Sequence, residues 1–291
     1  MEDIQKEKEE IRIDEKSYQL NEWKLTRKQV QLVHAFGLGP LAIIRPGRID
    51  YHLVAANIER WFYEINTFHF NIHTGEMTPT LFDVYEILGL VGDGNPDTCR
   101  PIKGLRKFIE DNLGIVPDGN LASLRHTWLK ANFRELAPDV TPVQVYRYTR
   151  AYLLFLISVT IFADASVSTV PTSPFIPLSS LGKACTFKRR HFSGSATLMR
   201  CWSYEHIMHM RPIPHNIPPN IPRAKRWELP KKYDDNPHNL MPPIRQEIDN
   251  LQPNEVIWNP YLNPDEVISD DWQQAFQTAM CPTTLIFDDI A

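Results

Sequence analysis

The sequence lacks an excess of charge of either sign and has few cysteines. Its 31 basic and 35 acidic residues give a net charge of −4. This balance excludes a general electrostatic footprint for nucleic acid, although it is compatible with local basic patches. The cysteines are widely spaced and form no CxxC pair, a pattern typical of reduced, buried thiols in an intracellular protein. They are Cys99, Cys185, Cys201 and Cys281.

A long hydrophobic run and a signal peptide are also absent. The longest apolar run, residues 151–163, is too short to span a bilayer and predicts a buried core helix. Residues 1–16 are charged throughout and lack the apolar region of a signal peptide. We therefore expect a protein that is neither secreted nor membrane-bound, in which residues 1–20 form a charged N-terminal tail.

Glycine is scarce and proline is abundant, with 12 and 24 residues, so the connections between elements should be stiff. Residues 211–243 are rich in proline and predict an extended connection with little regular structure. A hydrophobic fraction of 43% is ample for a core, and helical periodicity dominates the rest of the chain. The sequence therefore predicts a mainly α fold, a single irregular multi-helix domain over residues 21–291 with long proline-rich loops and few short strands.

Apolar periodicity and capping residues locate the expected helices. They cover residues 51–65 (capped by Asp50), 121–136 (capped by Asn120), 143–163 (opened by Thr141-Pro142), 195–210 and 270–280. The half from Ala151 to Ala163 is apolar all round and is predicted to be the most buried helical segment, with Leu154 and Ile157 in the core.

The segment "HTGEMTPTLFDVYEILGL", residues 73–90, places a histidine and a glutamate just before an amphipathic helix. Thr78 or Thr80 is a good N-cap, and Asp83 follows Thr80 at the spacing of a capping box. Helical spacing predicts that one face enters the core. Its residues are Leu81, Val84, Tyr85 and Leu88.

Two glycines should bound this segment. We expect Gly75 to make the turn before the helix and Gly89 to end it. Glu76 is expected near the positive end of the helix, where a carboxylate is favourable. The segment is therefore predicted to be an architectural joint and not a reactive loop.

Several patterns match the letters of a catalytic or metal site without the required context. The glycine-rich run 37–42 is followed by residues that break the helix a dinucleotide site needs. Lys183 lacks a recognisable phosphate-cradling loop. Two groups of possible metal ligands lack the context of a zinc site. They are His69, His73, Glu76 and Asp83, and Cys185, His191, Cys201, His206 and His209. His69 and His73 are four apart and could hold a metal on one helical face, but the stretch has Gly75, no helix signal and no HExxH motif. The second group fits no paired zinc-ligand spacing. We expect no metal, no cofactor and no enzymatic activity.

A basic segment, residues 222–232, gathers cationic side chains around Trp227. Together with the basic run at 188–191, it is a candidate nuclear import signal or nucleic-acid contact with one stacking ring. The alternative is a solvated proline-rich loop. The candidate nucleic-acid-binding residues are Arg223, Lys225, Arg226, Lys231 and Lys232.

Five stretches, in this order, resemble the plant mobile domain family, also labelled aminotransferase-like. They are "ERWFYEINTFHF" (59–70), "GEMTPTLFDVYEILGLVGDG" (75–94), "RAYLLFLISVTIFADASVSTVP" (150–171), "WSYEHI" (202–207) and "LQPNEVIWNPYL" (251–262). The family usually carries a further helical stretch where only residues 197–201 stand here, and it normally continues beyond residue 291. We therefore expect a shortened domain at these two places.

The resemblance implies a nuclear, mainly helical domain that arose with mobile elements and has no established catalytic residues. Host versions act in meristem maintenance, genome stability and the silencing of transposons. The resemblance favours a non-enzymatic nuclear interaction domain that binds nuclear proteins. The alternative is a domain that binds DNA or RNA, inherited from a mobile element. No membrane partner and no small-molecule substrate is evident.

Overall fold

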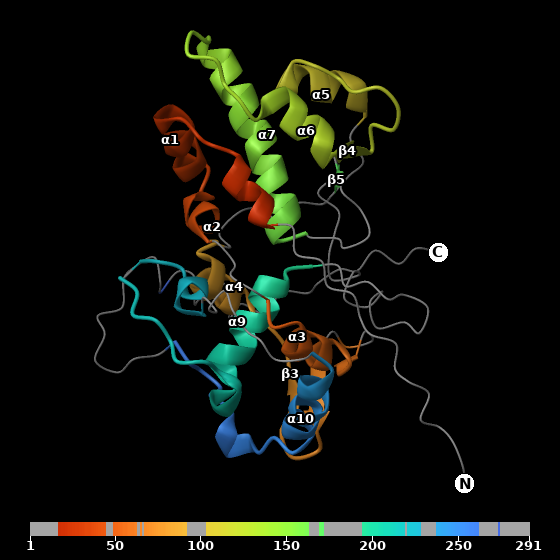
Figure 1. Cartoon of the computed structure of the whole chain (residues 1–291), viewed down its shortest axis with the longest axis vertical. Coiled ribbons are helices and arrows are strands. Elements are labelled where there is room, and N and C mark those ends of the chain that lie inside the picture. Colours follow the sequence, from red (N-terminus) through yellow and green to blue (C-terminus); the bar gives the residue numbers. More distant parts are fainter. Residues whose placement is uncertain are drawn as a thin grey trace.

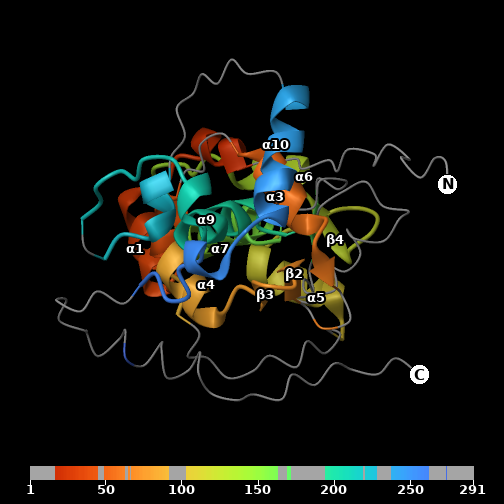
Figure 2. The same ribbon diagram turned by 90° about the horizontal axis from the view of Figure 1, so that it is seen from below.

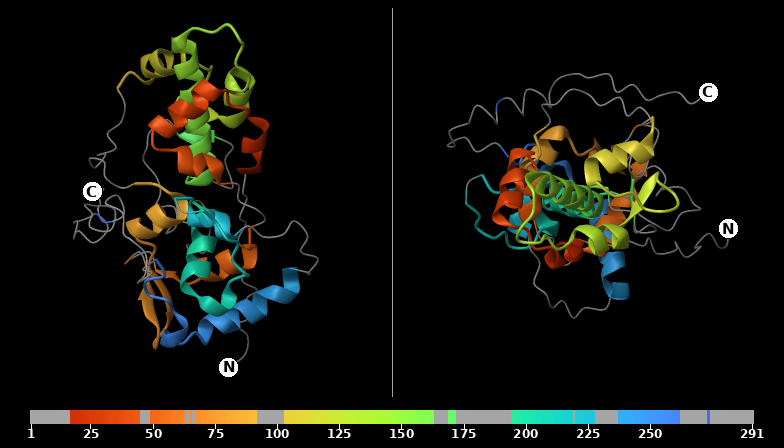
Figure 3. Two further views of the ribbon diagram at one scale, coloured as in Figure 1. Left: turned by 90° about the vertical axis from the view of Figure 1, so that its left-hand side faces the viewer. Right: turned by 90° about the horizontal axis from the view of Figure 1, so that it is seen from above.

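The computed structural model has the mainly helical architecture that the sequence predicts (Figure 1). It describes residues 17–44, 49–62, 65, 67–91, 103–162, 169–171, 194–218, 220–227, 237–261 and 273. The helices form two groups stacked along the long axis of the molecule, best separated in the left view of Figure 3. Buried apolar side chains connect the groups into one core that includes Phe155 in one group and Trp202 in the other. No described helix has the length and apolar character needed to cross a membrane.

The first group surrounds the long helix α7, Pro142–Thr160. The Thr141 hydroxyl accepts a hydrogen bond from the Gln144 N–H and the Gln144 side chain accepts from the Thr141 N–H, so the predicted start of this helix is confirmed. Trp23 packs against Tyr152 of α7. The elements packed against α7 are η1 (Ser17–Glu22), α1 (Arg27–Ala35), α5 (Leu105–Leu113), α6 (His126–Phe133) and β5 (Thr169–Pro171), which pairs with β4 (Ser123–Arg125).

The second group surrounds α9, Ala196–His206, a predicted helix that Ser195 caps. Around it lie α3 (Tyr51–Ile58), α4 (Leu81–Leu88), η2 (Met208–Met210), η3 (Arg223–Trp227) and, against α3, α10 (Pro237–Asp249). An antiparallel sheet with the order β1-β2-β3 pairs Trp61 with Phe68 and Phe68 with Met77. Its strands are β1 (Trp61–Phe62), β2 (Thr67–Asn71) and β3 (Gly75–Met77). Two short elements, α2 (Gly39–Ile43) and η4 (Pro253–Glu255), complete the described chain.

Two predicted helices are shorter than expected. Asp50 caps α3 as predicted, but the helix ends at Ile58 and the chain turns into β1. Phe62, expected in the core, is about half exposed. Trp61 packs edge-on against Phe68, so pairing with a strand still to come outweighs the helical periodicity. Asn120 accepts a hydrogen bond from the Ala122 N–H in a turn, and β4 then precedes α6.

The proline-rich region is only partly the extended connection that was predicted. Residues 211–218 have no regular secondary structure, whereas η3 lies within the predicted connection and α10 begins inside it and continues beyond residue 243. The carboxyl-terminal half of α10 is tied to α3 because Arg245 donates to Glu59 and Arg60 donates to Asp249. These contacts come from distant residues and are invisible to local propensity. The helix predicted over 270–280 lies outside the described residues, except for Gln273.

The segment 73–90 is a joint, but between a hairpin and a helix. Thr80 caps α4, with Asp83 in a capping box, as predicted. The buried face is rotated from the predicted one, because Leu81 is 55% exposed while Phe82 and Ile87 are buried. Glu76 lies in β3, 3.8 Å from the His69 ring, and not at the helix start.

Gly75 and Gly89 both have positive φ values, +79° and +69°. A β-carbon on Gly75 would meet no atom within 4 Å, whereas one on Gly89 would lie 2.4 Å from the Pro40 β-carbon in α2. Gly75→Ala should therefore cost only the left-handed strain, about 1–2 kcal/mol. Gly89→Ala should lower the free energy of unfolding by clearly more, measured by urea denaturation. Equal effects of the two substitutions would show that α4 does not pack closely on α2.

Most of the described part of the 151–163 segment, residues 151–162, is buried, but the prediction that it is the most buried helical segment is wrong, because in α9 only Leu198 is not fully buried. The two residues chosen as core positions are only half-buried. Leu156 is fully buried, whereas Leu154 and Ile157 are at the edge of the core. Leu156→Ala should cost about 2–5 kcal/mol, because the cavity forms in a closed site. Leu154→Ala is the matched control and should cost less than half as much in urea unfolding. The reverse order would contradict this orientation of α7.

Candidate functional site

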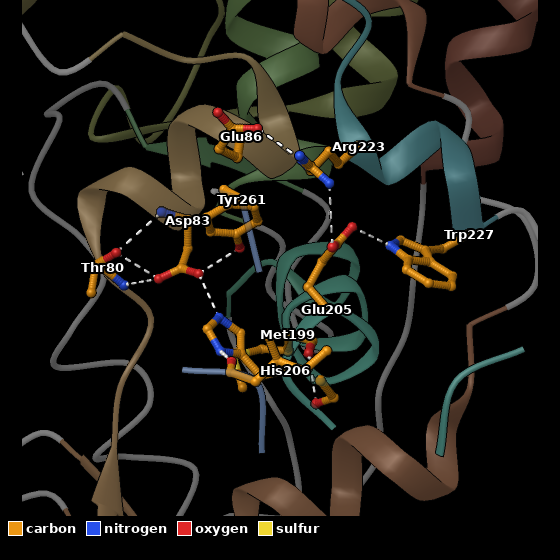
Figure 4. A network of polar contacts seen from close by, with 11 residues as sticks. Thr80, Asp83, Glu86, Met199, Glu205, His206, Arg223, Trp227 and Tyr261 are labelled. Atoms are coloured by element: carbon orange, nitrogen blue, oxygen red, sulfur yellow. Dashed lines mark hydrogen bonds and ion pairs between the residues drawn. The ribbon is translucent and has the colours of Figure 1, made fainter. Parts of the chain in front are cut away.

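A run of consecutive buried residues on α9, Trp202–His206, connects most elements of the second group (Figure 4). Trp202 packs against Phe68 and Phe70 of β2. Each residue after it makes a polar contact with a different part of the chain. Ser203 accepts from Asn57 of α3, Tyr204 donates to Asp50, Glu205 accepts from Trp227 of η3, and His206 contacts Asp83 of α4.

The Asp83 carboxylate is the most densely hydrogen-bonded group of this network. One oxygen accepts hydrogen bonds from the Thr80 N–H and hydroxyl, each at 2.6 Å. The other accepts from the Tyr261 hydroxyl at 2.6 Å and from His206 Nε2 at 2.8 Å. The side chain of Asp83 is only 3% exposed. Three segments distant in sequence therefore meet at one buried carboxylate.

The hydrogen bonds determine the ionisation state of Asp83. Burial alone raises the pKa of a carboxyl, but the hydrogen bond and the charge of His206, with those from Thr80 and Tyr261, hold the pKa of Asp83 below its ordinary value of 3.8. Burial and the negative charge of Asp83 raise the pKa of Tyr261, so its hydroxyl remains a donor. Asp83 is an ionised acceptor at neutral pH.

Both nitrogens of the His206 ring face acceptors. Nδ1 lies 2.8 Å from the backbone carbonyl of Ile257, which cannot donate a proton. Nε2 lies 2.8 Å from the ionised Asp83. His206 therefore links Asp83 of α4 to the segment around Ile257, which is also tied to α9 where Ile207 pairs with Val256.

Glu205 organises a second cluster on the neighbouring side of α9. Its carboxylate accepts from the Trp227 indole N–H at 2.8 Å and lies 3.6 Å from the Arg223 guanidinium. Arg223 also donates to Glu86 of α4 at 2.8 Å. Burial lowers the pKa of Arg223, but the hydrogen bond to Glu86 and the charge of Glu205 outweigh it and the pKa is raised. The Arg223 guanidinium lies 5.1 Å from the Tyr261 ring centre, which joins the two clusters.

This geometry stabilises the fold and does not open a reactive group to a substrate. The His206 and Asp83 side chains are 7% and 3% exposed, and both oxygens of Asp83 are already bonded. A general base must come within hydrogen-bond reach of a substrate proton. In this arrangement the pair contacts only other parts of the chain.

The structure separates the predicted nucleic-acid residues into two sets. Arg223, Lys225 and Arg226 lie in η3, whereas Lys231 and Lys232 lie outside the described residues. The suggested stacking ring is wrong, because Trp227 is 1% exposed and its ring lies among Tyr204, Arg226 and Glu205. Arg223 and Arg226 face Glu205, at 3.6 and 3.9 Å. Nucleic-acid contact by this segment stays a prediction.

The two histidine groups weighed for metal binding are dispersed in the part of the chain that is described. No three His, Cys, Asp or Glu side chains there are arranged to hold a metal ion. His69 contacts Glu76 in the hairpin, while Asp83 contacts His206. Cys201 is buried in α9. Cys185, His191 and Lys183 lie outside the described residues.

Sequence reasoning missed the pairing of Asp83 with His206 and of Glu205 with Trp227. Asp83 and His206 are 123 residues apart, so spacing carries no information about their contact. One signal was available. A helix that carries Ser, Tyr, Glu and His in succession beside Trp202 has polar groups on every face, and burying it requires a partner for each.

Removing the charge of Asp83 tests the network. Asp83→Asn should lower the free energy of unfolding by about 1–3 kcal/mol at pH 7, because the amide nitrogen that replaces one oxygen faces buried hydrogen-bond donors and leaves them unsatisfied. The folded-state pKa of Asp83 is depressed, so its contribution is full above pH 3.8 and is lost as the pH falls through the native pKa. The difference from wild type in urea unfolding should therefore shrink in acid.

A control separates the effect of removing a buried carboxylate from the effect of removing any carboxylate. Asp111→Asn changes an exposed carboxyl on α5 and should stay within about 0.5 kcal/mol of wild type. A difference for Asp83→Asn that is the same at pH 7 and pH 3 would contradict the ionised, hydrogen-bonded state assigned to it.

The chain is similar to proteins of one plant family over nearly its whole length. The model of the plant mobile domain matches residues 37–186 and 178–291. "Protein MAIN-LIKE 2" of Arabidopsis thaliana is 33% identical over 97% of this chain and 46% of its own length. "Protein MAINTENANCE OF MERISTEMS" of the same plant is 30% identical over 95% of this chain and 62% of its own length.

A more distant similarity links the chain to a longer protein. "Serine/threonine-protein phosphatase 7 long form homolog" of Arabidopsis thaliana is 30% identical over 84% of this chain but only 21% of its own length. No solved structure is significantly similar. The chain spans about half the length of the MAIN-type relatives. Three of the five stretches that carry the resemblance, 75–94, 202–207 and 251–262, meet at Asp83. With the family model matched over most of its residues, the chain belongs to the plant mobile domain family.

Proposed function

We propose that this chain is a non-catalytic interaction domain of transposon-related origin that acts in the nucleus by binding other nuclear proteins. The observation that supports the proposal is that the acid–base residues of the network are buried inside the fold. Asp83, Glu205 and His206 are buried and are bonded to other side chains of the fold. A domain with this interior interacts with partners through its surface.

The name of one relative supports the group of processes that we propose for this domain. One of them is named for the maintenance of meristems, and the chain matches 62% of its length. We place the present chain in the same group of processes, which comprises meristem maintenance, genome stability and transposon silencing. The family membership supports this assignment.

The alternative function, binding of DNA or RNA, has one specific observation in its favour. Lys225 lies in η3 among three cationic residues at the surface of the second group, and Lys231 and Lys232 follow closely in sequence. Against it, Glu205 lies within 4 Å of both Arg223 and Arg226 and offsets their charge. Protein binding is therefore the favoured function.

Capture of the tagged chain from cross-linked plant nuclei tests the proposal. We expect a reproducible set of nuclear proteins, retained after nuclease treatment because the contacts are protein-mediated. A destabilised Leu156→Asp variant should recover none of them, because an unpaired charge in the core prevents folding. Recovery of no nuclear protein by the wild-type chain would overturn the proposal.

A salt-dependent retention assay decides the alternative. Lys225, Lys231 and Lys232 are changed together to Gln, which spares the two arginines beside Glu205. The matched control changes Lys24, Lys103 and Lys107, exposed lysines of the first group. We expect weak retention on DNA and RNA that is equal in both variants. If only the first variant loses retention on DNA or RNA, and loses more of it at low salt, the nucleic-acid function would be favoured.

A further inference from the structure

Residues 211–218 form an extended segment between η2 and η3. It runs along the outer edge of the second group, visible as the cyan trace in Figures 1 and 2. Arg211 has φ −85° and ψ 142°, values of the polyproline II conformation. Proline fixes φ near −65° at Pro212 and Pro214, and the residue before a proline is driven toward the same region. The stretch Arg211–Pro214 therefore favours the polyproline II conformation, and none of its residues belongs to a helix or strand.

This stretch presents an apolar side chain to water. Ile213 is 90% exposed, more than any other large hydrophobic residue among those described, and it stands between two half-buried prolines. Arg211 at its start is also exposed, and no described ion pair involves it. An isolated exposed apolar residue needs no explanation by itself. Here the apolar side chain, the two prolines and the cation lie on one backbone of defined conformation.

The segment is held at both ends. Before it, Ile207 pairs with Val256, and the His206 carbonyl accepts from the Ile257 N–H at 2.8 Å. After it, the His215 N–H donates to the Arg226 carbonyl at 2.9 Å. A segment ordered before binding loses little conformational freedom in a complex. Contacts with the buried network therefore hold this segment in a fixed position on the surface before any partner binds.

We propose that residues 211–215 are the recognition motif for a partner domain that binds polyproline II helices. The partner carries a groove lined with aromatic rings, which takes the prolines and Ile213, and an acidic rim, which pairs with Arg211. This inference rests on the proposed function and names the surface and the class of partner. The stretch fits such a groove because residues 211–214 belong to no strand and the side chains of Arg211 and Ile213 are exposed.

The test uses the full chain and a panel of purified polyproline-binding domains of the SH3, WW and EVH1 types. We expect at least one to bind in isothermal titration, with chemical-shift changes at the aromatic residues of its groove. Ile213→Ser and Arg211→Gln should each weaken binding at least tenfold. Ile72→Ser, at a residue 85% exposed at the hairpin tip, is the matched control and should leave affinity unchanged.

The outcomes separate this inference from the proposed function. Binding to no member of the panel, or binding that persists in Ile213→Ser, overturns the polyproline motif. The polyproline motif is also overturned if the chain self-associates and Ile213→Ser abolishes the association, because the segment would then bind a second copy of the chain. If the Ile213→Ser variant captures the same nuclear proteins as wild type, the proposed interaction function is supported but the polyproline motif is contradicted. If the wild-type chain captures nothing, the proposed function itself fails.

Discussion

The arrangement of the second helical group depends on one buried carboxylate. Taking Asp83 out of water costs several kcal/mol unless hydrogen bonds replace those to solvent. Thr80 supplies two of them from the start of the same helix, and His206 and Tyr261 supply one each from remote segments. If either remote segment moved away, the carboxylate would lose a donor without gaining water. The position of α4 relative to α9 and to Tyr261 is therefore defined by polar contacts as well as by packing.

The apolar core alone does not determine this arrangement, because hydrophobic burial is non-directional. Phe68, Phe70 and Trp202 could pack in several orientations at similar cost, whereas the Asp83–His206 pair requires defined distances and angles. Glu205 adds a second directional requirement through Trp227. A fully satisfied polar network specifies one packing of an otherwise adaptable core. This accounts for the succession of polar residues on a helix that is buried on all sides.

Interactions between residues close in sequence were predictable, whereas those between distant residues were not. The caps at Thr80, Thr141 and Asp50 were predictable, because each joins residues three apart. The end of α3 and the start of β1 were not, because the partner of Trp61 comes later in the chain. The network was out of reach for the same reason, although the resemblance had already singled out the three stretches that contain Asp83, His206 and Tyr261.

Three of the stretches that carry the family resemblance contain residues of the buried network. Specificity for a binding partner must therefore come from other parts of the chain. Asp83 and Glu205 are paired with other residues inside the fold, so substituting them would disturb its packing whatever the chain binds. They do not distinguish one partner from another. That distinction has to come from surface segments held by the network, and the 211–218 segment is attached to it directly. His215 donates to the Arg226 carbonyl, and the Arg226 side chain lies 3.9 Å from Glu205. A substitution at this edge can therefore alter recognition without breaking the interior pairs that the edge contacts.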